Sequence, residues 1–333
     1  MKYPILKKTP KGAPSTDASV LEELSKSHEL PKLILKYREY EKLRSTYIEG
    51  LKNEVVKNRV HTSYNLFGTT TGRLSSEKPN LQNIPNKTDM GQRIREFFIA
   101  DSKHVFVIAD YSQIELRVLA HLSNDKSMID MLQNRESDIH SETASKIFQT
   151  NIESVTKDMR RKAKEVNFGL IYGMESFGLS KSLNISKKEA EELIEAYFSQ
   201  FPKIKGFLDK IVDDATTNTF TETLYGRKRY IKELASSNFQ LKAMGKRIAM
   251  NAPIQGTASD IMKIAMIKLN KEIQKIKSTD LLLQIHDEII IQTPKESANK
   301  VSKIVKKEME GASKLKVPLF VDIKENINLS NLN

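Results

Sequence analysis

Two aspartates each stand next to a short apolar run. Asp110 directly follows Val105-Phe-Val-Ile-Ala109, and Asp287 separates two further runs, 281–285 and 289–292. Carboxylates at the ends of two buried, rigid strands would suit a two-metal phosphoryl-transfer site, because Mg²⁺ prefers oxygen ligands and two ions can activate the attacking oxygen and stabilise the leaving one. A helix cap at Asp110 and a polar hairpin tip at Asp287 are the alternatives. The spacing in the sequence alone does not show that the two aspartates lie close together in the fold.

A second set of residues recurs every four positions. Arg160, Lys164, Phe168 and Tyr172 would line one slowly drifting face of a helix. Two cations followed by two aromatic rings fit a triphosphate clamp with a base-stacking platform beyond it. The alternative is an ordinary amphipathic helix, with its basic residues in water and its rings in the core.

A third set, Arg247, Asn251 and Gln255, has the same spacing, with Pro253 between its last two members. Asn and Gln side chains both donate and accept hydrogen bonds, so a row of them can follow base edges in a minor groove. A polar helix face is the alternative interpretation.

Composition narrows the partners that such residues would meet. The chain has 333 residues, and its 54 Lys and Arg against 42 Asp and Glu give a net charge of +12. A protein this basic usually faces a polyanion such as nucleic acid. A lysine-rich solubilising surface is the alternative.

Several classes of site are excluded by residues that the sequence lacks. It has no cysteine, which excludes a disulfide framework, a Cys nucleophile and a Cys-containing zinc finger. It has neither the P-loop nor the dinucleotide glycine motif, so metals and side chains would have to hold nucleotide phosphates. No apolar run approaches the ~18 residues of a membrane span, and no secretory signal is evident. We therefore expect a soluble protein of a reducing compartment.

The N-terminal part of the chain begins with turn-forming residues and continues with helical patterns. We expect a short helix around Val20 capped by Ser15 or Thr16, and a long helix over 31–56. The stretch 61–92 is polar, rich in turn-forming residues and shows little periodicity. A stretch of that length inside a compact domain usually has a function, although a solvated loop is the alternative.

The rest of the chain indicates few, mostly antiparallel strands and a long helical insertion, hence an α+β class. Ser186 and Glu189 form the pattern of a capping box at the start of one helix. The expected elements are a strand over 105–109, a helix after Gln113, helices over most of 137–218, a hairpin over 220–230, a helix over 238–275, strands over 281–285 and 289–292, a helix over 295–310 and a strand over 317–323.

At these residues the sequence resembles the family A DNA polymerases, the bacterial DNA polymerase I type. The resemblance covers about residues 8 to 323 and rests on motifs that occur in the order of that family. They are Thr71-Gly-Arg-Leu-Ser-Ser and Pro79-Asn-Leu-Gln-Asn-Ile-Pro85 of the template-loop segment, Asp110-Tyr-Ser-Gln-Ile-Glu-Leu of the first catalytic motif, Arg160 to Gly173 of the fingers helix, Asn251-Ala-Pro-Ile-Gln-Gly-Thr of the late palm helix and Gln284-Ile-His-Asp-Glu288 of the last motif.

The resemblance implies a right-hand polymerase fold. Its parts would be a small, mostly antiparallel palm sheet, a helical fingers insertion and a partial helical thumb. Residues 1–58 would form the C-terminal part of the thumb, 59–121 the first part of the palm, 122–236 the fingers and 237–333 the second part of the palm.

The resemblance also implies a reaction and the residues that carry it. A primer 3′-hydroxyl would attack the α-phosphate of a deoxynucleoside triphosphate on a DNA template and release pyrophosphate. Asp110, Asp287 and the backbone carbonyl of Tyr111 would bind two Mg²⁺ ions, with Glu288 supporting the site. Glu115 would crowd the 2′ position of the sugar and so exclude ribonucleotides.

Two larger sets of residues would bind the substrates, with Lys164 also a general acid toward pyrophosphate. The set for the incoming nucleotide is Arg160, Lys164, His140, Phe168, Tyr172, Gln113 and Glu115. The set for the primer–template is Arg73, Asn80, Asn83, Arg247, Asn251, Gln255 and His286.

The match begins inside the thumb, so the resemblance implies a chain without proofreading or 5′-nuclease domains. Its partners would be primer–template DNA and dNTPs, not a membrane, and it would act in the cytoplasm at the nucleoid. A separate chain that supplies the missing thumb and exonuclease-like domains, a split enzyme and a gene fragment are alternatives. A single-subunit RNA polymerase is disfavoured by Glu115 and Tyr172, and a non-catalytic DNA-binding remnant is the other rival.

Overall fold

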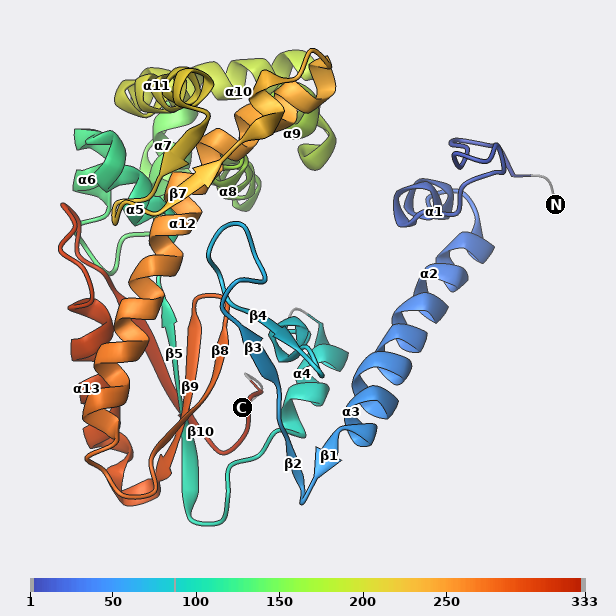
Figure 1. Cartoon of the computed structure of the whole chain (residues 1–333). Helices are drawn as coiled ribbons and strands as arrows, with labels where there is room; N and C mark the ends of the chain where they lie inside the picture. Colours follow the sequence, from blue (N-terminus) through green and yellow to red (C-terminus); the bar gives the residue numbers. More distant parts are fainter. Residues whose placement is uncertain (1–2, 87, 331–333) are drawn as a thin grey trace. The chain divides into compact units, whose positions relative to one another are not determined.

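The structure is a computed structural model that describes residues 3–86 and 88–330 (Figure 1). The chain divides into two compact units. One comprises 1–64, 76–99 and 328–333, and the other comprises 65–75 and 100–327. Each unit is described by itself.

The larger unit is built on a four-stranded antiparallel sheet with the strand order β10-β5-β9-β8. The strands are β5 (His104–Tyr111), β8 (Asp280–Ile285), β9 (Glu288–Pro294) and β10 (Val321–Asn326). The central strands β5 and β9 are apolar on both faces, since Ala109 and Ile289 are buried on one face and Ile108 and Ile290 on the other. Burial on both faces explains why these strands read as continuous apolar runs.

Two long helices flank the sheet. Helix α13 (Ala298–Glu310) packs on β5, β9 and β10, and α12 (Phe239–Ile273) packs on α13. Helix α12 continues past the sheet, and the remaining helices gather around its N-terminal half (Figure 1). These helices are α5 (Ile114–Ser123), α6 (Lys126–Met131), α7 (Ile139–Ile147), α8 (Lys157–Ile171), α9 (Ser176–Leu183), α10 (Lys187–Gln200) and α11 (Pro202–Asn218), followed by the hairpin of β6 (Phe220–Glu222) and β7 (Lys228–Tyr230).

A single core joins the sheet to the helical part of this unit. It includes Leu116 of α5, Ile171 of α8, Tyr197 of α10 and Ile261 of α12, all buried together with the residues of β5 and β9. Because one core spans both parts, the elements that carry the candidate site residues are held rigidly within this unit.

The smaller unit is mainly helical. Helices α1 (Ala18–Ser25) and α2 (Glu29–Lys42) are followed by a π-helical segment (Leu43–Glu49), α3 (Gly50–Asn53) and the hairpin of β1 (Val55–Val56) and β2 (Arg59–Val60). A 3₁₀ turn (Leu81–Asn83) and α4 (Asp89–Glu96) complete it, and the strands β3 (Ser63–Asn65) and β4 (Ser75–Glu77) lie at the boundary of the two units.

Most of the expected elements are confirmed, including the α+β class and the mostly antiparallel strands. The capping box is present, since the Ser186 hydroxyl accepts from the Glu189 N–H and the Glu189 carboxylate accepts from the Ser186 N–H. The expected helix over 31–56 starts at Glu29 and ends at Asn53, with the π-helical segment inside it. In that segment the Ser45 hydroxyl donates to the Glu41 carbonyl at 2.7 Å, a contact that competes with the regular helical hydrogen bond.

Two details were predicted wrongly. Asp17, not Ser15 or Thr16, occupies the N-cap position of α1, because the Ser15 hydroxyl is already used as the acceptor of the Asp17 N–H. The last strand begins at Val321 rather than Val317. Val317 and Leu319 are buried as strand residues would be, but Pro318 between them has no N–H to give to a ladder.

Candidate active site

Strand register brings carboxylates together at one end of the four-stranded sheet. Asp110 on β5 pairs with Glu288 on β9 and with Asp322 on β10, so these three side chains share one face. Asp287 lies in the two-residue turn between β8 and β9, and its carbonyl accepts a hydrogen bond from the Tyr111 N–H at 3.1 Å. The two aspartates that the sequence could not bring together thus lie at the same end of the sheet, and Asp110 caps no helix.

The clustered negative charges change how Asp110 and Asp287 titrate. Burial of the carboxyl, together with the charges of Asp287, Glu288 and Asp322, raises the pKa of Asp110 to about 7. Burial also raises the pKa of Asp287, although the positive charge of Arg73 opposes this change. An added cation would relieve both effects, because it favours the ionised carboxylates.

The donor atoms at this end of the sheet fit Mg²⁺. Two aspartate carboxylates and a backbone carbonyl are hard oxygen donors, and Mg²⁺ is usually held by one or two carboxylates plus water and substrate phosphates. Within residues 3–86 and 88–330, no cluster of three or more His, Asp or Glu side chains could hold a metal ion by itself. A metal here would take its remaining oxygen ligands from water or from a bound phosphate.

The backbone after Asp110 is fixed by partners that sequence reasoning missed. The buried Tyr111 donates its hydroxyl to the Met309 carbonyl at 2.7 Å. The buried guanidinium of Arg117 donates to the carbonyls of Ser112, Leu132 and Pro318 at 2.8 to 2.9 Å. An arginine in the middle of an apolar helical pattern was the available signal, because such a residue is rarely buried without a structural role.

Glu115 lies in the first turn of α5, at the centre of a polar network. It is buried, with 6% of its surface exposed, and it accepts from Arg73 at 2.7 Å and from the Tyr172 hydroxyl at 2.9 Å. Burial raises its pKa, while Arg73, Tyr172 and a hydrogen bond from Gln255 lower it. Arg73 also lies 3.7 Å from the Asp287 carboxylate, so its guanidinium links Glu115 to the carboxylate end of the sheet.

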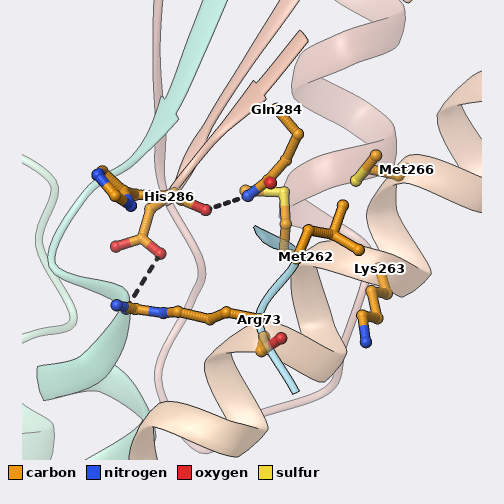
Figure 2. Close-up of a pocket in the computed structure, with 9 residues that line it drawn as sticks. Arg73, Met262, Lys263, Met266, Gln284 and His286 are labelled. Carbon is orange, nitrogen blue, oxygen red and sulfur yellow. Dashed lines mark hydrogen bonds and ion pairs between the residues drawn. The ribbon is translucent and has the colours of Figure 1, made fainter. Parts of the chain in front are cut away.

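The side chain of His286 lies beside this link. Figure 2 shows the small pocket where Arg73 reaches the Asp287 carboxylate, with His286 and Gln284 on the opposite side. The Gln284 amide donates to the His286 carbonyl and holds the turn, in which His286 has a left-handed backbone with φ of 55°. Four further residues of the long helix and one of the loop line the pocket: Ser259, Met262, Lys263, Met266 and Leu74.

Helix α8 carries the predicted cation and aromatic face. Thr156 caps its N-terminus by accepting from the Met159 N–H. Arg160 is exposed and forms an ion pair with Asp138 at 2.6 Å, and Lys164 is exposed one turn further. Phe168 is half-buried, and Tyr172, at the C-terminus of the helix, keeps 42% of its surface exposed. The amphipathic-helix alternative would have placed both rings in the core, and this arrangement leaves them partly open.

His140 on α7 lies behind this face. Its ring is 5.6 Å from the ring of Phe168, its Nδ1 is 3.2 Å from the Asn167 amide and its Nε2 is 3.5 Å from the amide of Gln113. Burial lowers the pKa of His140 to about 4, and the charges of Arg160 and Lys164 add to this effect while Asp138 opposes it. The ring is therefore neutral at pH 7.

The third predicted set lies along α12. Arg247 is exposed, and Asn251 and Gln255 are half-buried. Gly173, with a φ of +66°, lies so close to Arg247 that a Cβ at this position would be 2.9 Å from the Arg247 Cγ. The amide nitrogen of Asn251 is buried and has no hydrogen-bond partner. An orphan donor of this kind usually marks a place for a ligand or water.

Asn80 and Asn83 belong to the smaller unit. Both are exposed, the Asn80 carboxamide oxygen accepts from the Gln82 N–H at 3.0 Å, and the Asn83 carbonyl accepts from the Tyr47 hydroxyl. These contacts fix the turn that carries the two asparagines.

In the described residues no helix is long and apolar enough to span a bilayer.

Comparison with known proteins places the chain in a family. The model of DNA polymerase family A matches residues 1–330. The chain is 50% identical, over 98% of its length, to 39% of the DNA polymerase I of Caldicellulosiruptor bescii, and 46% identical, over 96% of its length, to 39% of the thermostable DNA polymerase I of Thermus aquaticus. It thus spans about two fifths of these curated relatives.

A solved structure gives the same result for the fold. The POL domain of Pol1 from M. smegmatis, in complex with DNA primer–template and dNTP, superposes with a TM-score of 0.93 and 39% sequence identity, over 99% of this chain and 58% of that one. The expected right-hand polymerase fold is confirmed. The chain belongs to DNA polymerase family A.

Proposed function

We propose that the chain is a template-directed DNA polymerase domain, which adds deoxynucleotides to a primer 3′-hydroxyl and releases pyrophosphate. The observation that carries the proposal is the convergence of Asp110 and Asp287 at one end of the sheet, linked through Arg73 to Glu115. The membership of DNA polymerase family A and the similarity to bacterial DNA polymerase I support the same reaction. Such an enzyme would act on nucleoid DNA in the cytoplasm.

In the proposed site, Asp110, Asp287 and the Tyr111 carbonyl would hold two Mg²⁺ ions, with Glu288 beside them. When bound, the ions would lower the pKa of the primer hydroxyl and neutralise charge on the phosphates. The protein's contribution is placement, because the register of β5 with β9 and the Tyr111 to Asp287 hydrogen bond fix the two carboxylates. Fixed carboxylates lose little entropy when they bind an ion.

The exposed face of α8 would hold the triphosphate. Arg160 and Lys164 are accessible cations, and Arg160 would exchange its Asp138 partner for phosphate oxygens. Lys164 would donate a proton to the leaving pyrophosphate. Because His140 is neutral at pH 7, its one ring N–H could donate to a phosphate oxygen without adding charge.

Sugar and base would be recognised next to the same helix. Phe168 and Tyr172 present partly open rings against which the sugar and the nascent base pair would stack. Glu115 is held by Arg73 and Tyr172, so its carboxylate would occupy a fixed volume at the 2′ position. Gln113, whose amide faces His140, would complete the nucleotide site.

Primer–template DNA is the proposed partner, as it is in the complex of the M. smegmatis domain. Asn251 and Gln255 would reach base edges, and the orphan amide of Asn251 would gain an acceptor. Arg73, Asn80, Asn83, Arg247 and His286 would contact the primer end and the backbone. The assignment of 1–58 to a thumb, 59–121 and 237–333 to a palm and 122–236 to fingers, and a separate chain as a further partner, stay predictions.

Primer extension with Mg²⁺ on this chain tests the proposal. We expect addition of the nucleotide that is complementary to the template, and loss of addition when Mg²⁺ is chelated. Binding of a labelled primer–template without any extension, under conditions where a bacterial DNA polymerase I is active, would instead support the non-catalytic DNA-binding alternative. Equal use of ribonucleotides would support the RNA polymerase alternative.

A further inference from the structure

The guanidinium of Arg227 lies between two backbone segments that are far apart in the sequence. Its Nη2 donates to the Thr71 carbonyl at 2.8 Å and to the Gly256 carbonyl at 3.0 Å, and its Nε donates to the Asp260 carboxylate at 2.9 Å. Arg227 thus ties the loop after β3 to α12. It comes from the hairpin of β6 and β7 and belongs to none of the motifs that carry the resemblance.

Two glycines make room for this guanidinium. A Cβ at Gly72 would lie 2.4 Å from the Arg227 Cζ, and a Cβ at Gly256 would lie 2.9 Å from its Nη2. Gly72 also has a φ of +81°, which disfavours other residues. The planar fork of arginine can satisfy three acceptors in this slot, whereas a lysine ammonium in the same place cannot match their geometry.

The loop that Arg227 holds ends in Arg73. The Gly72 carbonyl accepts from the Ser259 hydroxyl at 2.8 Å, so the loop backbone is attached to α12 on both sides of Gly72. From the next residue, the Arg73 guanidinium reaches Glu115 at 2.7 Å and Asp287 at 3.7 Å, the second contact being drawn in Figure 2. A shift of the loop backbone would therefore move the group that orients Glu115.

We propose that Arg227 is a positioning residue for sugar selection. It acts through Arg73, because it fixes the backbone from which Arg73 holds the Glu115 carboxylate at the 2′ position. The inference rests on the proposed polymerase function. It assigns Arg227 no contact with DNA, nucleotide or metal.

The test compares Arg227→Met and Arg227→Lys with the unaltered chain and with Lys228→Met. Lys228 is the next residue of the hairpin. Its ammonium group pairs with Glu222 and lies over the ring of Phe220, within the hairpin itself, so it is a matched control. The readout is kcat/KM for dCTP divided by kcat/KM for CTP, both measured by single-nucleotide primer extension. The thermal unfolding midpoint is measured alongside it. We expect this ratio to fall by about tenfold in both Arg227 variants and to stay unchanged in the control.

A double-mutant cycle separates positioning from a general structural role. In an Arg73→Ala background, Arg227→Lys should have no further effect on the dCTP to CTP ratio, since the group through which it acts is gone. Selectivity that is unchanged in the single variants, or a fall that is equally large in the Arg73→Ala background, would overturn the inference. Should Arg227→Met not fold, Arg227→Lys decides by the same comparison.

Failure of the proposed function would look different. If the unaltered chain extends no primer, the polymerase proposal fails before any variant is measured. If it extends primers and the Arg227 variants discriminate sugars as well as it does, only the positioning role fails.

Discussion

The carboxylate end of the sheet and the exposed face of α8 differ in how their charges are compensated. At the sheet, register forces Asp110, Glu288 and Asp322 onto one face, and the pKa of Asp110 rises to about 7. On α8, Arg160 is already paired with Asp138, whose pKa is held at about 2. The first region has an excess of negative charge on rigid strands, and the second has a cation that must change partners. We therefore expect the first to act by fixed geometry and the second by exchange.

The largest effect should come from the carboxylates. Asp110→Asn or Asp287→Asn should lower primer extension by at least about a thousandfold, because each removes a charged metal ligand that other residues cannot replace. DNA affinity, measured by fluorescence anisotropy, should stay nearly unchanged. Asp322→Asn is the matched control, since Asp322 shares the face but is paired with Arg135 at 3.0 Å. Near-normal turnover in either of the first two variants would refute the metal assignment.

The next effect concerns sugar choice at Glu115. Glu115→Ala should lower the preference for dNTPs over rNTPs by about ten- to a hundredfold, because it opens the space that the carboxylate fills. Glu115→Gln keeps the volume and an acceptor for the Tyr172 hydroxyl, so it should retain most of the preference. Competition between dNTP and rNTP in primer extension gives the ratio. An equal loss in both variants would mean that charge, not volume, excludes the ribose.

A smaller effect should follow from Arg160. Arg160→Ala should raise the KM for dNTP by about tenfold, the value of one charge-assisted hydrogen bond that first has to be released from Asp138. Arg161 offers a matched control, because it is the next residue, is similarly exposed and pairs with Asp158. Steady-state kinetics of both variants decides the point. Equal KM values for the two would indicate that the α8 cations act only through net charge.

The same comparison shows what a sequence can predict. Local patterns predict three of the elements that carry the site. Apolar runs predict the strand before Asp110 and the hairpin that carries Asp287, and residues spaced four apart predict the helix that carries Arg160. That Asp110 faces Glu288 and Asp322 depends on sheet register between distant strands, which no local pattern fixes.

Local patterns also do not predict which residues that are distant in the sequence pair with each other. Asp138 was not predicted to pair with Arg160, and Arg117 and Arg227 were not singled out, although each satisfies several backbone carbonyls or a carboxylate. Charged residues are mostly exposed, so a sequence alone predicts exposure for each of them. Only the fold shows which few are buried against their hydrogen-bond acceptors. The motif match supplied the proposed roles of the site residues, but not the groups that hold those residues in place.

The smallest expected effect is on stability at low pH. Burial alone would raise the pKa of Asp138, but hydrogen bonds from Arg160 and Ser141 outweigh it and hold the pKa at about 2, below the ordinary 3.8. A carboxyl whose pKa is lowered by folding stabilises the folded chain above its unfolded pKa, and this stabilisation is lost as the pH falls from about 4 to about 2. Since 40% of the Asp138 side chain is exposed, screening should limit the contribution to about 1 kcal/mol or less.

Asp138→Asn isolates this contribution, because the carboxamide oxygen can still accept from the His140 N–H at the start of α7. We expect the unaltered chain to have the higher free energy of unfolding near pH 6, and the difference between the two chains to shrink as the pH is lowered through the window between 4 and 2. Urea unfolding at several pH values measures it. A difference that stays constant down to pH 2 would show that the ion pair with Arg160 contributes nothing to folding, and that Arg160 is already free to bind phosphate.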